Sequence, residues 1–165
     1  MALSKEQAAE LILARRRARV SFLEWCKLVN ETQPPAHHHT LIIEVLQAMT
    51  ERQPINTYPV LYALVKKIHP HYDTSKPLRK VMFLMPPGTA KSTYTSKLFP
   101  AWYLGKCPGH TILSCSYSKD LVAGFGRNCR NLVEERSLVL GYNLNKDSRA
   151  ADEWETSNDI GRAHV

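Results

Sequence analysis

This 165-residue chain lacks paired cysteine motifs, internal repeats and long hydrophobic runs. Its four cysteines are scattered without a Cys-x-x-Cys pair, which excludes common zinc spacings and a secreted disulfide framework. The first residues lack a basic stretch followed by an apolar one, so we expect no signal peptide. No stretch approaches the roughly 20 apolar residues that span a bilayer. We therefore expect a cytoplasmic protein with no membrane partner.

The charge of the chain favours a polyanionic partner. Lysine and arginine outnumber aspartate and glutamate by 22 to 15, which gives a net charge of +7. DNA, RNA or a nucleotide would suit this excess. The hydrophobic share of 44% and the charged share of 22% are ordinary for a globular protein, so intrinsic disorder is not expected.

The N-terminal part is predicted to be helical. A helix is expected over 4–29, because Ser4 is a good N-cap and Gln7 completes a capping box. Its arginines at 15, 16, 17 and 19 are read as a solvated face, with contact to DNA or another acidic partner as the alternative. Further helices are expected over 39–50 and 60–68. We assign 1–76 to a helical N-terminal region that includes a variable insertion.

From residue 78 the pattern alternates between strands and helices. The apolar run 80–85 predicts a buried strand that meets a loop, and a helix is expected from Ser92 to about Tyr103. A second strand is expected over 111–115, and Ser118 should cap a helix that runs to about Glu135. This order predicts an α/β fold with a parallel sheet.

The loop Pro86-Pro87-Gly88-Thr89-Ala90-Lys91-Ser92-Thr93 lies between the first predicted strand and helix, as a Walker A phosphate-binding loop does. Such a loop holds phosphate with backbone N–H groups and the positive end of the following helix. We expect ATP and Mg²⁺ here, with Lys91 as the catalytic cation on the β- and γ-phosphates and Ser92 as a metal ligand. The predicted cofactor-binding residues are Pro87, Gly88, Thr89, Ala90, Lys91, Ser92 and Thr93.

Two positions depart from the Walker A pattern. Met85 stands where the first glycine is expected, and Ala90 replaces the glycine before the lysine. An alanine at position 90 is tolerable only if its φ stays negative and the phosphate does not crowd its methyl group.

The loop and its surroundings resemble the large terminase subunit of tailed bacteriophages, the ATPase and nuclease that packages DNA. The similar stretches cover roughly 20–50 and 78–156. They include the loop itself, the helix at 98–105, the segment 112–127, the proline–histidine segment 35–39 and the stretch 147–156. In that family the proline–histidine segment lies near the adenine side of the pocket.

The resemblance implies a P-loop NTPase core over 77–165, truncated at its C-terminal side. It also implies ATP hydrolysis that drives translocation of double-stranded DNA, in the host cytoplasm. The expected partners are a portal protein and a small terminase subunit, with a homo-oligomeric ring for the full-length protein. A Walker B acidic pair and the nuclease carboxylates have no candidate in this sequence. Glu134 and Glu135 come nearest but fall in a predicted helix.

Other interpretations stay open. The chain is either such a motor fragment, another P-loop NTPase such as a helicase or nucleotide kinase, or a nucleotide-binding fragment without turnover. Arg127 and Arg130 are weighed as an arginine finger or DNA contact against a solvated helix face. His37-His38-His39 and the His69 and His71 pair lack metal-ligand spacing, and Trp102 with Tyr103 is expected to pack in the core.

Overall fold

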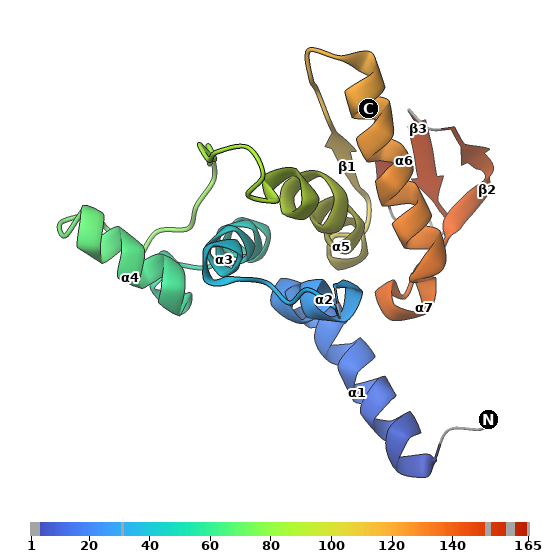
Figure 1. Cartoon of the computed structure of the whole chain (residues 1–165), viewed down its shortest axis with the longest axis horizontal. Coiled ribbons are helices and arrows are strands. Elements are labelled where there is room, and N and C mark those ends of the chain that lie inside the picture. Colours follow the sequence, from blue (N-terminus) through green and yellow to red (C-terminus); the bar gives the residue numbers. More distant parts are fainter. Residues whose placement is uncertain (1–3, 31, 151–152, 158–160, 165) are drawn as a thin grey trace.

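The computed structural model describes residues 4–30, 32–150, 153–157 and 161–164. It is mostly helical, with one small sheet near the C-terminal end (Figure 1). The helical elements are α1 (Lys5–Val20), α2 (Phe22–Val29), α3 (His37–Glu51), η1 (Ile55–Thr57), α4 (Pro59–Ile68), η2 (Thr93–Leu98), α5 (Phe99–Lys106), α6 (Lys119–Glu135) and α7 (Ser137–Leu140). The strands are β1 (His110–Leu113), β2 (Leu144–Arg149), β3 (Glu153–Thr156) and β4 (Gly161–His164).

The predicted P-loop core with a parallel sheet is wrong. The strands lie in the order β1-β4-β3-β2, and only β1 and β4 run parallel, whereas β4–β3 and β3–β2 are antiparallel. The segment 80–85, predicted as a buried strand, belongs to no sheet. Phe83 and Met85 pack against the hydrophobic core, but Met82 and Leu84 are more than 80% exposed. Among the described residues, 80–85 has no hydrogen-bonded partner strand, although β1 lies at the edge of the sheet and is paired with β4 alone.

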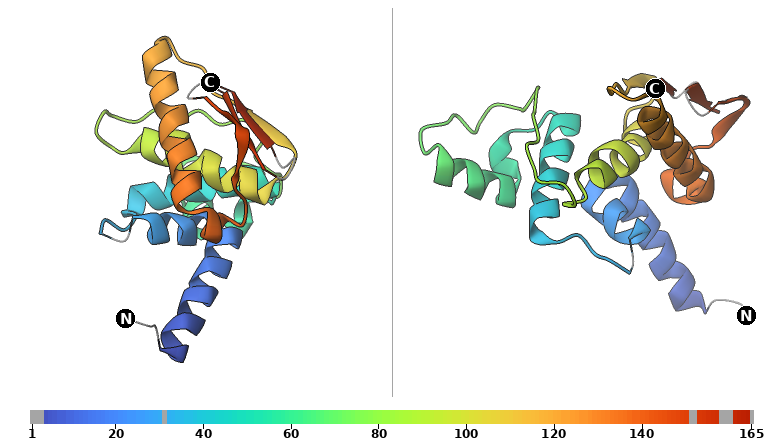
Figure 2. Two further views of the ribbon diagram at one scale, coloured as in Figure 1. Left: turned by 90° about the vertical axis from the view of Figure 1, so that its right-hand side faces the viewer. Right: turned by 45° about the horizontal axis from the view of Figure 1, so that its top comes forward.

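The predicted first helix is two helices. Ser4 and Gln7 form the expected capping box at the start of α1. The chain then breaks at Ser21, which is extended with φ −109° and ψ 123° and caps α2 through its side chain. The Phe22 N–H donates to the Gln47 side chain at 3.0 Å, so a contact from α3 helps to fix the break. Figure 2 shows the first turns of α1 projecting away from the rest of the protein.

The core joins the first two helices to the helix that follows the loop. Phe22, Trp25 and Trp102 are buried at its centre. Each indole N–H in this group has a backbone acceptor: Trp25 donates to Leu98 O at 3.1 Å, and Trp102 donates to Ala18 O at 3.0 Å. Burial without these bonds would leave polar groups unsatisfied. The prediction that Trp102 packs in the core is confirmed.

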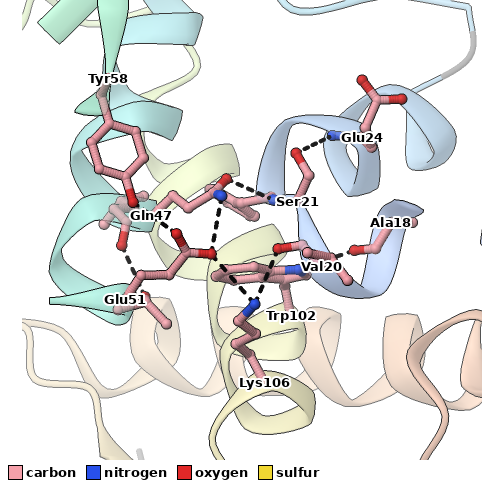
Figure 3. Close-up of polar contacts among 12 residues, drawn as sticks. Ala18, Val20, Ser21, Glu24, Gln47, Glu51, Tyr58, Trp102 and Lys106 are labelled. Atoms are coloured by element: carbon pink, nitrogen blue, oxygen red, sulfur yellow. Dashed lines mark hydrogen bonds and ion pairs between the residues drawn. The ribbon is translucent and has the colours of Figure 1, made fainter. Parts of the chain in front are cut away.

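A polar network ties α3 to α5 and to the junction of α1 and α2 (Figure 3). Glu51, at the end of α3, accepts from Tyr58 Oη at 2.8 Å and from Gln47 Nε2 at 3.1 Å, and it pairs with Lys106 Nζ at 3.3 Å. The same ammonium group donates to Val20 O at 3.3 Å. The network therefore fixes the C-terminal end of α3 against α5.

Candidate phosphate-binding loop

The candidate site is the loop that leads from the extended segment 77–85 into η2. A cavity of about 430 Å³ lies over it, lined by residues 85–93. All seven predicted cofactor-binding residues, from Pro87 to Thr93, line this cavity. Because they are consecutive in the sequence, a single turn brings them together without help from the sheet.

The turn uses two residues in the left-handed region of the Ramachandran map. Gly88 has φ +80°, and Ala90 has φ +54°. The requirement of a negative φ at position 90 is therefore wrong for this structure. A methyl-bearing residue in this region costs about 1–2 kcal/mol, so the surrounding structure must maintain the conformation. The Thr89 hydroxyl, which donates to Pro86 O at 2.8 Å, closes the turn.

Backbone donors are left free along the turn. Within the part of the chain that the structure describes, the N–H groups of residues 88–92 donate to no acceptor. The Ala90 carbonyl already accepts from Thr93 N at 3.0 Å and Tyr94 N at 3.3 Å, so the helical segment begins directly after the turn. Five consecutive free donors beside a helix start can bind the oxygens of an anion.

Lys91 and Ser92 add side-chain groups to this arrangement. Both are half-buried, and neither side chain has a hydrogen bond or ion pair among the described residues. The lysine charge and the serine hydroxyl thus remain available to a bound phosphate.

The helical segment after the turn begins in an unusual form. η2 is a π-helix, and it passes directly into α5 at Phe99. Such turns are rare and often occur at functional sites. Leu98 O, at the end of η2, accepts the Trp25 indole N–H, which anchors this segment in the core. The helix predicted from Ser92 to about Tyr103 is confirmed in position and extends to Lys106.

His39, at the start of α3, forms a hydrogen bond with the backbone of the loop. Its Nδ1 accepts from Ala36 N at 3.1 Å, so Nε2 carries the proton and donates to Thr89 O at 3.2 Å. Its ring packs on Tyr94, with the ring centroids 4.6 Å apart. Burial lowers the His39 pKa most, the charge of His38 lowers it further, and the Thr89 hydrogen bond opposes the change. The neutral form that donates to the loop is therefore favoured.

The sequence did not indicate a contact between His39 and the loop, because 50 residues separate His39 from Thr89. The only signal was the resemblance of segment 35–39 to a family segment near the adenine side of a nucleotide pocket. The structure places His39 against the loop backbone. No local pattern in the sequence would have identified that contact.

Acidic side chains are absent from the loop. Among the described residues that line its cavity, none is aspartate or glutamate. Glu134 and Glu135 are exposed in the last turn of α6, in the helix that was predicted for them. No three His, Cys, Asp or Glu side chains gather into a metal site within the described residues. A metal ion at the loop would thus rely on Ser92 and on the oxygens of its ligand.

The two candidate arginine fingers lie on α6. Neither Arg127 nor Arg130 lines the loop cavity. Arg130 donates to the side chain of its neighbour Asn131 at 3.0 Å. The structure thus gives neither arginine a place beside the loop.

None of the described helices combines the length and the apolar character needed to cross a bilayer.

We also compared the chain with known proteins. No protein-family model matches it, and no curated protein or solved structure does so either.

Proposed function

We propose that the loop 85–93 binds the phosphates of ATP. The observation that carries this proposal is the row of five N–H groups, from residue 88 to residue 92, that have no acceptor among the described residues, next to Lys91, which has no partner among them either. A triphosphate carries several negative oxygens close together. Donors that converge on such oxygens form charge-assisted hydrogen bonds, which are about twice as strong as neutral ones.

The proposal depends on the loop and the helical segment after it, and it does not require a parallel sheet. The turn closes through Thr89 and Pro86, and it is held by His39 on one side and by the anchored η2 on the other. Lys91 would neutralise charge on the terminal phosphates. Mg²⁺ would supply a second positive charge on the phosphates, with the Ser92 hydroxyl as its protein ligand.

The absence of an acidic lining residue favours binding without turnover by this chain. Hydrolysis requires a group that orients or activates water, usually a carboxylate or an amide near the terminal phosphate. Among the described residues, the side chains that line the cavity include hydroxyl and ammonium groups but no carboxylate or amide. We therefore propose that the chain retains a nucleotide and that it hydrolyses ATP slowly or not at all by itself.

We also propose a role in DNA packaging, which rests on the resemblance to terminase large subunits. ATP hydrolysis by the full-length protein would drive double-stranded DNA into a capsid in the host cytoplasm. The excess of lysine and arginine over acidic residues suits contacts with phosphate backbones that ignore sequence. A portal protein, a small terminase subunit and a ring of copies would be its partners.

The test is a titration of a fluorescent ATP analogue with Mg²⁺. Lys91→Ala is compared with Lys97→Ala, which removes an equal charge from the same helical segment outside the cavity. We expect saturable binding, weakened at least about tenfold by Lys91→Ala because a charge-assisted contact is lost. Lys97→Ala should leave the affinity within about twofold.

Equal losses in the two variants would mean that only net charge attracts the nucleotide, and the loop proposal would then be wrong. A phosphate-release assay on the same samples separates binding from hydrolysis. Multiple turnovers that stop in Lys91→Ala would overturn the proposal of retention without hydrolysis. Circular dichroism establishes beforehand that each variant is folded.

A further inference from the structure

We propose that a second cavity, separate from the loop, binds a small organic phosphate. It has a volume of about 660 Å³, which is within the usual range for small-molecule sites. Its walls come from the end of α3, the segment 77–79, α5 and the start of β1. None of the described residues lines both this cavity and the loop cavity, so the two are separate sites.

Two arginines give the cavity its positive charge. Arg52 and Arg79 line it and are exposed, and neither has a hydrogen bond or ion pair within the described residues. The neighbouring acidic residue, Glu51, does not neutralise them, because it is engaged by Tyr58, Gln47 and Lys106 (Figure 3). None of the described lining residues is acidic. The balance of charge therefore favours an anion.

A hydrogen-bonded pair of side chains lies beside the arginines. The Tyr103 hydroxyl and His110 Nδ1 are 2.7 Å apart, and both residues line the cavity. Burial raises the Tyr103 pKa most, and the neighbouring Cys107 raises it further, so the hydroxyl stays protonated. The charge of Arg52, which lines the same cavity, opposes that rise. The two guanidinium groups match the several oxygens of a phosphate, and the Tyr103–His110 pair adds polar atoms to the same cavity wall.

The backbone at Arg52 supports a positioning role. Arg52 ends α3 with φ +52°, a left-handed conformation that costs a non-glycine residue about 1–2 kcal/mol. Glycine or asparagine is usual at this place in a helix. An arginine held there against its preference is an observed backbone outlier beside a cavity, the kind that often marks a binding site.

Most of the other lining residues are apolar, with Thr50 and Thr111 as the exceptions, which points to an organic ligand. Leu78, Phe99 and Ile112 line the cavity, and the Phe99 ring lies 5.4 Å from the Tyr103 ring between centroids. An aromatic or aliphatic group attached to the phosphate would be removed from water against these side chains. Inorganic phosphate would gain the polar contacts alone.

Phenyl phosphate is the probe that tests this. Its affinity is measured by NMR titration of the ¹⁵N-labelled chain, following the amide of residue 52 and the His110 side chain. We expect saturable shifts, with affinity about tenfold weaker in Arg52→Gln and in Arg79→Gln, because each loses a charge-assisted contact. Arg16→Gln on α1 is the matched control, because it removes an exposed arginine from outside the cavity.

Lys91→Ala distinguishes this site from the ATP-binding loop. Phenyl phosphate should bind this variant as it binds the wild type. Binding that is lost in Lys91→Ala, or that is unchanged in Arg52→Gln and Arg79→Gln, would overturn the second site. Inorganic phosphate should bind at least several-fold more weakly than phenyl phosphate. Equal affinity would overturn the assignment of an organic ligand. The exposed arginines make few contacts, so a retained ¹H–¹⁵N spectrum shows that each variant is folded.

Discussion

Replacing Ala90 with glycine should stabilise the protein, although glycine normally weakens a folded chain. Ala90 has φ +54° directly before a helical segment. An alanine in this conformation costs about 1–2 kcal/mol, which glycine would recover. Glycine also gains freedom in the unfolded chain, which offsets about 0.5–1 kcal/mol. The net expectation is a gain of about 0.5–1 kcal/mol, or roughly 1–4 °C in Tm for a chain of this size.

The matched control for this substitution is Ala63→Gly. Ala63 is exposed in the interior of α4, where the same change should cost about 1 kcal/mol through helix propensity. Urea unfolding followed by circular dichroism at 222 nm gives both values. The two substitutions should therefore shift the midpoint in opposite directions. A midpoint that falls in Ala90→Gly as it does in Ala63→Gly would refute the left-handed conformation and the loop geometry built on it.

Three further predictions concern the loop and the core. Gly88→Ala should lower the free energy of unfolding by about 1 kcal/mol, because Gly88 has φ +80°. The cost comes from backbone strain alone, since a Cβ there would meet no atom within 4 Å, and urea unfolding measures this loss of stability. Because the His39 pKa is lowered in the folded protein, the free energy of unfolding should fall as the pH drops below 6.5, the ordinary histidine value. The urea midpoint should therefore decrease between pH 7.5 and pH 5.5, and it should decrease less in His39→Gln. A pH dependence identical in that variant would exclude His39 as the cause. Trp102→Ala should cost about 3–5 kcal/mol, since a fully buried ring and its bond to Ala18 O are lost, and a cost under about 1 kcal/mol would contradict the packing.

Local signals in the sequence predicted most helices correctly. Ser4 and Ser118 cap α1 and α6 as expected, and α3 and α4 lie within a few residues of their predicted ranges. These features depend on side chains within one or two turns. The break at Ser21 was missed because it depends partly on Gln47 in another helix.

The sheet could not be predicted in the same way, because strand formation depends on partners far along the chain. Residues 80–85 have the composition of a buried strand, yet they pair with no strand within the described part of the chain. β1 pairs with a C-terminal strand that no pattern had indicated. The candidate loop was predictable because its residues are contiguous. Its contact with His39 and the cavity beside Arg52 were not, since both depend on how α3 packs.

The two sides of the phosphate-binding loop differ in how firmly they are held. Downstream, η2 is anchored in the core by the bond from Trp25 to Leu98 O. Upstream, no backbone hydrogen bond among the described residues holds 78–85, and Met82 and Leu84 face solvent. Low protection of this kind marks a segment that opens locally at small cost. Packing of Phe83 and Met85 against the core, rather than backbone hydrogen bonding, holds this upstream side. The entropy lost when a ligand orders the loop would therefore fall mainly on 78–85.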